Sequence, residues 1–298
     1  MKIFSGSSNK PLAQKIAREL GLKLGKIELS RFPNGEARVW VKEKVNNGIC
    51  LIVQSFSLPP DENIIEFCLI ADALYRAGAR RTIGVVPWFG YCIQDKVFRQ
   101  GEPLTSKVIA KIVHQAKIKK LITVDLHNET ILGFFDKPVL HLSATDLFIN
   151  YFKKEDKIDF VVSPDVGALK KVTKLANRLD LPIAVINKKR DLKTGRVSIL
   201  GINQEVKGKK VLINDDFTST GQTLIKTAAY LKKMGVEKVY ASLAHHFYIP
   251  GVQEKIEKSQ IDKLFVTDTI APPKNKKYQK LKIISISGLL TQAIKDFK

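Results

Sequence analysis

The sequence predicts an α/β protein of two domains, each with a mostly parallel sheet flanked by helices. Short runs rich in Val and Ile alternate with amphipathic stretches of helical period along its 298 residues. This length is sufficient for two domains of ordinary size, and the alternation restarts after Thr145. We therefore expect an N-terminal domain over residues 1–144 and a C-terminal domain over residues 145–298, with the last helix able to pack back on the N-terminal domain.

The first half begins with an expected strand at residues 2–5, and local signals mark several later elements. The dipeptide Asn34-Gly35 predicts a tight hairpin between two strands. In the first long helix, Ile65, Leu69 and Ala73 recur at helical spacing, and we expect this face to be buried. The expected strands are 2–5, 26–29, 37–41, 49–54, 82–87 and 121–125, and the expected helices are 12–20, 62–76 and 106–115.

The second half shows the same alternation of strands and helices. Gly235 is a typical helix stop and supports the end of the helix before it. The expected strands are 160–163, 183–186, 196–200, 210–213, 239–243, 264–266 and 282–285, and the expected helices are 146–152, 168–179, 224–234, 252–256 and 289–297.

The composition is that of a soluble globular protein, with 44% hydrophobic and 27% charged residues. No apolar run approaches the roughly 20 residues that a membrane span needs. The N-terminus turns polar after Phe4, unlike a signal peptide. Cys50, Cys68 and Cys92 are odd in number and share no short spacing, which argues against a disulfide framework and a cysteine zinc site. We expect a cytoplasmic protein with no membrane partner.

The formal net charge is +21, from 50 basic and 29 acidic residues. Such a charge indicates anionic partners, either nucleic acid or small phosphorylated ligands. The lysines are dispersed and are not interleaved with aromatic residues in a nucleic-acid motif. We therefore favour small phosphorylated ligands and do not expect a specific nucleic-acid partner.

The most informative stretch runs from Val211 to Thr223. An apolar strand leads into two adjacent carboxylates, Asp215 and Asp216, and a turn rich in hydroxyl groups then opens a helix. Open α/β sheets place their sites at the carboxyl ends of strands, and a helix N-terminus favours phosphate. Carboxylates side by side can hold sugar hydroxyls or magnesium. The simpler alternative, that these residues only cap the helix, explains less of the extended pattern.

Further polar clusters lie near other strand ends and in two loops. His127 alone suits a structural hydrogen bond, Asp165 a helix cap, and the run 188–190 a solvated basic surface. The turn 32–36 and the loop 90–101 are polar segments of the kind that often carry function. The sequence has no Gly-x-x-x-x-Gly-Lys-Ser/Thr loop, so any nucleotide phosphates are held in another way.

Taken in order, these segments resemble the ribose-phosphate diphosphokinase family, built on the type I phosphoribosyltransferase-like (Rossmann-like) fold. The resemblance covers nearly the whole chain. The matching segments are RFPNGE, PWFGYCIQDK, GEPLTSK, VDLHNETILGFFDKPV, VVSPDVGALK, INKKR and INDDFTSTGQT.

The resemblance implies transfer of the diphosphoryl group of ATP to the anomeric hydroxyl of ribose 5-phosphate, with Mg²⁺ required. The products are 5-phosphoribosyl 1-diphosphate and AMP. It also implies a homo-oligomer (dimer, tetramer or hexamer) whose ATP site is shared between subunits. The residues implied are Lys188 and Arg190 for catalysis; Phe32, Asn34, Gly35, Glu36, Gln94, Asp95, Lys96 and Arg99 for ATP; Asp215, Asp216, Ser219, Thr220, Gly221, Gln222 and Thr223 for ribose 5-phosphate; and His127 and Asp165 for metal.

Five positions depart from the family pattern, among them Ser219, where many bacterial members have Asp. Ile93 stands where the family has an ATP-contacting arginine, which allows a second reading, a silent paralogue that binds nucleotide or ribose phosphate and regulates a partner enzyme. Asn34 replaces Asp, Gln222 replaces Gly, and His246 stands where a small residue is usual. A third reading, a phosphoribosyltransferase or regulator on the same fold, leaves the second βα half and the FPNGE turn unexplained.

Overall fold

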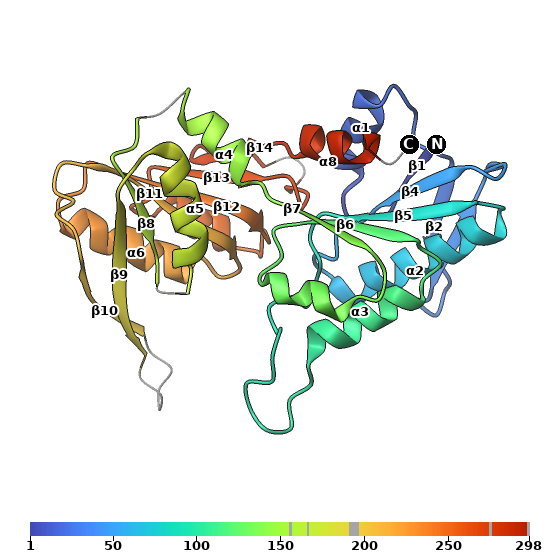
Figure 1. Cartoon of the computed structure of the whole chain (residues 1–298), viewed down its shortest axis with the longest axis horizontal. Helices are drawn as coiled ribbons and strands as arrows, with labels where there is room; N and C mark the ends of the chain where they lie inside the picture. The colour runs from blue at the N-terminus through green and yellow to red at the C-terminus, as the bar shows by residue number, and fades with distance from the viewer. Residues whose placement is uncertain (155–156, 166, 191–196, 274–275, 297–298) are drawn as a thin grey trace. The chain divides into compact units, whose positions relative to one another are not determined.

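The computed structural model describes residues 1–154, 157–165, 167–190, 197–273 and 276–296, without the side chains of residues 188–190 and 197–198. Grouped by contacts, the chain forms two compact units (Figure 1). The N-terminal unit comprises Met1–Ser143, Asp268–Ala271 and Ser285–Lys298, and the C-terminal unit comprises Ala144–Thr267 and Pro272–Ile284.

The N-terminal unit has a five-stranded parallel sheet in the order β1-β4-β5-β6-β7. Helices α2 and α3 cover one face of this sheet, and α1 and α8 lie on the other (Figure 1). A separate antiparallel hairpin, β2-β3, lies against α2, where Arg31 pairs with Glu62. The elements are β1 (Lys2–Ser5), α1 (Lys10–Glu19), β2 (Ile27–Arg31), β3 (Ala37–Val41), β4 (Ile49–Val53), α2 (Pro60–Arg76), β5 (Arg81–Val86), α3 (Thr105–Gln115), β6 (Lys120–Val124), the 3₁₀ helix η1 (Glu129–Phe134), β7 (Val139–Leu142) and α8 (Ser287–Lys295).

The predicted buried face of α2 is wrong. Ile65 is 52% exposed and Leu69 is 38% exposed, whereas the neighbouring face that carries Phe67 and Ile70 is buried. The helix is apolar on both faces, so spacing alone did not choose between them. The sheet selects the face with Phe67, because Gly84 of β5 leaves room for that ring: a Cβ at Gly84 would lie 2.7 Å from Phe67 Cζ.

The C-terminal unit has a seven-stranded sheet in the order β10-β9-β8-β11-β12-β13-β14. All neighbouring pairs are parallel except β10 with β9. Two domains with mostly parallel sheets confirm the predicted fold class. The elements are α4 (Thr145–Phe152), β8 (Phe160–Ser163), α5 (Leu169–Leu179), β9 (Ile183–Arg190), β10 (Val197–Ile202), β11 (Lys210–Thr218), α6 (Gln222–Lys233), β12 (Lys238–His246), α7 (Val252–Glu257), β13 (Lys263–Thr267) and β14 (Leu281–Ile284).

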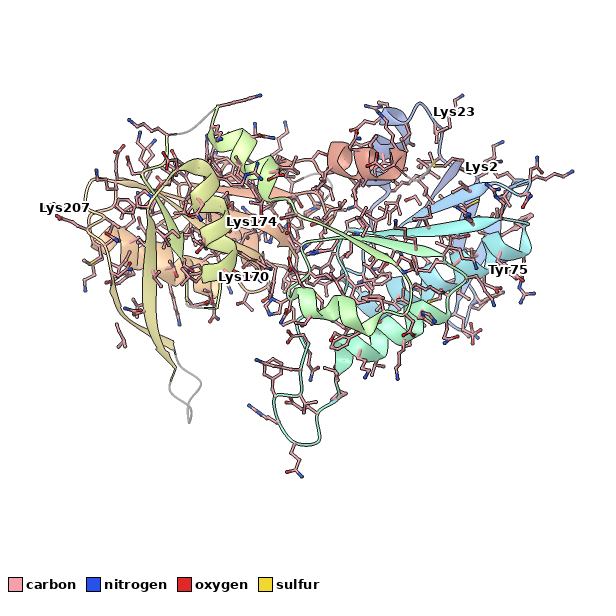
Figure 2. All side chains as sticks on the ribbon, in the orientation of Figure 1. Lys2, Lys23, Tyr75, Lys170, Lys174 and Lys207 are labelled. Carbon is pink, nitrogen blue, oxygen red and sulfur yellow. The ribbon has the colours of Figure 1, made fainter. Side chains whose placement is uncertain are left out.

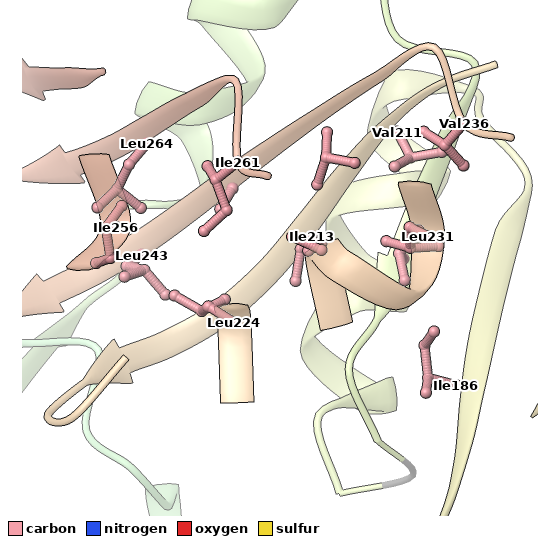
Figure 3. Packing of buried hydrophobic residues seen from close by; sticks show 14 of the residues in the cluster. Ile186, Val211, Ile213, Leu224, Leu231, Val236, Leu243, Ile256, Ile261 and Leu264 are labelled. Atoms are coloured by element: carbon pink, nitrogen blue, oxygen red, sulfur yellow. The ribbon is translucent and has the colours of Figure 1, made fainter. Parts of the chain in front are cut away.

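A large apolar cluster fixes β11 and α6 in this unit (Figure 3). Ile213 of β11 and Leu243 of β12 face Leu224 and Leu231 of α6, with Ile256 of α7 beside them. All five side chains are buried, and each contributes about 1.5–3 kcal/mol relative to an exposed position. The cluster therefore holds rigid the loop that joins β11 to α6.

The largest differences from the prediction concern strands. Strand β7 was not predicted, and β9, β11 and β12 extend to Arg190, Thr218 and His246 rather than ending at Ile186, Ile213 and Leu243. In β11 the apolar run stops but the backbone continues to pair with β12, as far as Thr218 opposite His246. Side-chain periodicity does not report such backbone pairing. Residue 196, the predicted start of one strand, lies outside the described residues.

Within the described part of the chain, we find no helix that is both long enough and apolar enough to cross a membrane.

Candidate active site

The turn 32–36 closes the β2-β3 hairpin in a defined conformation. Phe32 N donates to Glu36 O (2.9 Å), Gly35 N donates to Phe32 O (2.8 Å), and Gly35 has a φ of 89°. Asn34 Oδ1 accepts from Glu36 N (3.2 Å), so the Asn34 amide nitrogen is the part of that side chain not used in the turn. Phe32 is 47% exposed, and the Arg38 guanidinium lies 5.7 Å from its ring centroid. The turn thus presents an aromatic face that can cover a flat ring.

The loop after β5 is fastened at Gln94 and Asp95. The Gln94 side chain accepts a hydrogen bond from Thr105 Oγ1 at the start of α3. Asp95 Oδ2 accepts from Asn128 Nδ2 (2.8 Å), and Asn128 directly follows His127. The structure therefore brings the Gln94–Asp95 part of the loop next to the half-buried His127 at the end of β6.

The rest of this loop is exposed and carries two cations. Lys96 Nζ lies 5.1 Å from the centroid of the Phe98 ring, and Arg99 N donates to Glu102 Oε2 (3.1 Å). Ile93 is 40% exposed in the same loop. Its side chain offers no charge to a phosphate, so any cationic contact from this loop must come from Lys96 or Arg99.

In the C-terminal unit, Asp165 lies between β8 and α5. Its Oδ1 accepts from Ala168 N (3.0 Å), and its carbonyl accepts from Ser163 Oγ (2.7 Å). Asp165 therefore caps the start of α5, as the simpler interpretation of the sequence suggested. Only Oδ1 takes part in this cap, so Oδ2 can bind a metal ion in the same geometry.

Lys188 and Arg190 belong to the extended strand β9. Their backbones pair with Ile199 and Val197 of β10 in antiparallel register. Their side chains lie outside the described residues, so their catalytic assignment stays a prediction.

Asp215 and Asp216 lie inside β11 rather than after its end. Adjacent strand residues normally face opposite sides, so we expect the two carboxylates to approach a ligand from different directions, and their assignment to ribose 5-phosphate stays a prediction. Asp216 N donates to Asp215 Oδ1 (2.8 Å). Asp216 Oδ1 is 2.6 Å from Lys171 Nζ of α5, and the Asp216 side chain is only 14% exposed. The two acids therefore have different environments.

Lys171 was not predicted as a site residue. In the sequence, Lys171 belongs to a run of lysines about one helical turn after Asp165. Such a run is also typical of a solvent-exposed helix face, so it did not single out Lys171. Lys170 and Lys174 lie on the same helix (Figure 2). Only the sheet, by placing α5 beside β11, pairs Lys171 with Asp216.

The loop from Thr218 to Gly221 ends at the N-terminus of α6. Gly221 has a φ of 72° and occupies the N-cap position without a side-chain hydrogen bond to the first turn. Its carbonyl accepts from Ile225 N (2.9 Å), while Gln222 and Thr223 are exposed. Backbone N–H groups at such a helix start attract an anion. The seven residues predicted for ribose 5-phosphate are thus all in β11, this loop and the first turn of α6.

His246 is buried at the end of β12, opposite Thr218. Its Nε2 lies 2.8 Å from Gln253 Oε1, and Gln253 Nε2 donates to Glu257 Oε1 (2.9 Å). The Gln253 amide nitrogen is thereby used, which assigns the proton of neutral His246 to Nε2. Burial lowers the pKa of His246 below its ordinary value of 6.5, and the Gln253 contact opposes this only in part.

The His246→Gln variant is expected to lose less stability on acidification than the wild type. The unfolded chain takes up a proton at His246 at a higher pH than the folded chain does. Neutral His246 therefore contributes its full stabilisation when the pH is above the ordinary pKa of 6.5. This stabilisation is lost as the pH falls below 6.5 toward the lowered pKa of the folded state. Urea unfolding at about pH 7.5 and about pH 5.5 measures the difference. Equal losses in both proteins would contradict a role for His246.

The two residues predicted for metal, His127 and Asp165, belong to different units. No group of three or more His, Cys, Asp or Glu residues suited to a metal occurs among the described residues. Magnesium is commonly held by one or two protein ligands, substrate phosphates and water, so it does not require such a group. An aspartate with one oxygen engaged fits this mode of binding.

Residues 1–116 match the family described as the N-terminal domain of ribose phosphate pyrophosphokinase, and residues 135–269 match the phosphoribosyl transferase domain. The ribose-phosphate pyrophosphokinase of Fusobacterium nucleatum is 39% identical over 298 residues, which cover 99% of this chain and 94% of that protein. That of Listeria ivanovii is 38% identical, over 99% and 93% of the two chains.

Among solved structures, the phosphoribosylpyrophosphate synthetase of Mycobacterium smegmatis superposes with a TM-score of 0.92 at 29% identity, covering 99% of this chain and 98% of that one. Both halves of the chain therefore have their counterparts in full-length relatives. The resemblance seen in the sequence motifs is confirmed, and the chain belongs to the ribose-phosphate pyrophosphokinase family.

Proposed function

We propose that this protein transfers the diphosphoryl group of ATP to the anomeric hydroxyl of ribose 5-phosphate, releasing AMP. One observation carries the proposal: the same chain contains both parts that the reaction needs. A loop after β11 ends at the N-terminus of α6, where a phosphate can bind, and a complete second α/β unit matches the N-terminal domain of the family. A phosphoribosyltransferase needs only one such domain, so that reading leaves the N-terminal unit without a role.

The acceptor is held by the loop 218–223. Backbone N–H groups at the start of α6 bind the 5-phosphate, and the hydroxyls of Ser219, Thr220 and Thr223 add further donors. Asp215 and Asp216 hold the 2- and 3-hydroxyls, with Lys171 fixing the position of Asp216. Held by both ends, the sugar presents its anomeric oxygen in one orientation.

The donor is held by the N-terminal unit. Phe32 covers the adenine ring, Asn34 and Glu36 contact its polar edge, and the 94–99 loop contacts the phosphates. The exposure of Phe32 supports our further proposal that this turn serves a neighbouring subunit of a homo-oligomer. Light scattering of the purified protein tests the oligomer.

In the transfer, a bond forms between the anomeric oxygen and the β-phosphorus of ATP. The bond from that phosphorus to the oxygen bridging to the α-phosphorus breaks, AMP leaves, and the hydroxyl loses its proton. Lys188 and Arg190 neutralise the charge that develops on the transferring group. When bound, magnesium supplies charge shielding on the phosphates, and His127 and Asp165 are the residues that would hold it.

Incubation with ATP, magnesium and ribose 5-phosphate tests the proposal by the release of AMP and of phosphoribosyl diphosphate. Release of AMP only when ribose 5-phosphate is present supports the proposed reaction. Absence of AMP over a range of phosphate and magnesium concentrations would favour the silent paralogue.

Ile93→Arg is expected to lower the KM for ATP about tenfold, because a guanidinium adds a charge-assisted phosphate contact in the loop. The control is Ile93→Gln, which is polar but uncharged. Steady-state kinetics with varied ATP measure the effect. An unchanged KM would mean that Lys96 or Arg99 already supplies the missing cation.

A further inference from the structure

The reaction proposed above gives His246 no role, although this residue is fully buried at the start of the loop 218–223. In the register of the sheet it lies opposite Thr218, the residue with which β11 ends and the loop begins. Phe247 N donates to Thr218 O (3.3 Å), so the end of β12 is bonded to the first residue of the loop. A shift of β12 at this end therefore reaches the loop directly.

The same loop also packs on helix α7, which follows β12. A Cβ at Gly221 would lie 3.2 Å from Val252 Cγ1 and 3.6 Å from Ile256 Cδ1, so the loop backbone is close to this helix. Ile256 is also part of the apolar cluster that contains Leu224 of α6 (Figure 3). The loop is therefore in contact with both the end of β12 and α7, and the separation of these two elements affects its position.

A buried side chain joins α7 to the end of β12. Gln253 of α7 is 2% exposed, and its Oε1 lies 2.8 Å from His246 Nε2, which donates to it. Its Nε2 donates to Glu257 Oε1 (2.9 Å), one turn further along the helix. Because both ends of the amide are used, the Gln253 side chain is held in one orientation.

The far end of this series of hydrogen bonds is fixed by backbone groups. The Glu257 carboxylate accepts from Gln279 N (3.0 Å) and from Lys280 N (3.1 Å), just before β14. Glu257 therefore keeps two donors even when Gln253 is replaced. An unbroken run of directional bonds connects the backbone before β14 with His246.

Apolar side chains of similar size could fill the same space, so the polar pair needs another explanation than burial alone. A fully bonded polar network defines a single geometry, because hydrogen bonds are directional and apolar contacts are not. A small residue at position 246, as is usual in the family, could not reach Gln253.

We propose that His246 and Gln253 are positioning residues that set the place of the loop 218–223 and, through it, the affinity for ribose 5-phosphate. The part of this inference that concerns ribose 5-phosphate rests on the proposed function.

Four variants of the full-length protein separate positioning from stability. His246→Leu and Gln253→Met each leave a buried polar partner without its hydrogen bond, so both should lower the free energy of unfolding measured in urea. The double variant leaves neither partner unpaired and should recover part of that loss. His246→Gln keeps an N–H donor near the place of Nε2 and should have a KM for ribose 5-phosphate within about twofold of the wild type.

The double variant gives the decisive measurement. We expect its KM for ribose 5-phosphate to stay raised about tenfold, with the KM for ATP within about twofold, because apolar contacts do not restore the geometry of the loop. Hydrogen exchange of the amides of residues 219–223, followed by mass spectrometry without substrate, should be faster than in the wild type. The exchange rate does not depend on turnover, so it tests the positioning role even if the protein forms no AMP, a result that would count against the proposed function alone.

Asp262→Leu is the matched control at the opposite end of β12. It removes the hydrogen bond from Val239 N to Asp262 Oδ2 (2.7 Å) and the ion pair with Lys232, so it should lower stability and leave the loop unchanged. Loop exchange as slow as in the wild type in the double variant would overturn the proposal, because the pair would then contribute only stability. Equally fast loop exchange in Asp262→Leu would overturn it as well. If the double variant does not fold, Gln253→Met compared with Asp262→Leu gives the same decision.

Discussion

Lys188→Ala is expected to lower kcat for AMP formation about 1000-fold while the Kd for ATP changes about twofold or less. In phosphoryl transfer the protein supplies mainly positioning and charge. A cation that meets the transferring group only as charge develops on it contributes to the transition state and little to substrate binding. Strand β9 places the Lys188 backbone in the sheet, opposite Ile199 of β10.

The matched control is Lys189→Ala, which removes the same charge from the next residue of the same strand. The family resemblance assigns no role to Lys189, so its kcat should stay near that of the wild type. Single-turnover kinetics and equilibrium binding of ATP separate the two effects. If ATP binding and turnover fall by the same factor in Lys188→Ala, Lys188 holds the ground state and the catalytic assignment is wrong.

The sequence predicts what depends on side-chain pattern along the chain. Alternating runs predicted two mostly parallel sheets, and the order of short motifs predicted the family. The N-terminus of α6 was also foreseen within two residues, because Gly221 and the hydroxyl-rich turn before it have local signatures.

Features that depend on which elements meet in space were not predictable in this way. Helix α2 has two apolar faces, and only the space above Gly84 decides that Phe67 rather than Leu69 is buried. The ion pair of Lys171 with Asp216 needs α5 to pack beside β11, although the two residues are far apart in sequence. The extension of β11 through Asp215 depends on backbone pairing with β12, to which polar side chains give no clue.

Gly221→Ala is expected to raise the KM for ribose 5-phosphate about 100-fold, with the KM for ATP nearly unchanged. Gly221 has a φ of 72°, a conformation that costs an L-residue about 1–2 kcal/mol. A Cβ there would also lie 3.2 Å from Val252 Cγ1 of α7. Val252 or the loop must give by a few tenths of an ångström to relieve this contact, and we expect the loop to move and to carry with it the backbone N–H groups proposed to hold the 5-phosphate.

Gly208→Ala is the matched control for the free-energy cost of placing an alanine at a positive φ. Gly208 has a φ of 70°, and a Cβ there would have no neighbour within 4 Å. Both variants should lose about 1–2 kcal/mol of unfolding free energy, because alanine is strained at a positive φ. Only Gly221→Ala should also lose affinity for ribose 5-phosphate. The difference between the two therefore isolates the displacement of the loop from the strain that both share.

Adding Val252→Ala to Gly221→Ala tests the cause of the displacement. The shorter side chain removes the atom nearest to the new Cβ, so part of the affinity for ribose 5-phosphate should return even though the double variant is less stable. Recovery of KM together with a further fall in unfolding free energy distinguishes loop position from global stability. If Gly221→Ala and Gly208→Ala show the same KM for ribose 5-phosphate, the phosphate does not bind at the start of α6, because displacement of those N–H groups would then have no effect on the acceptor.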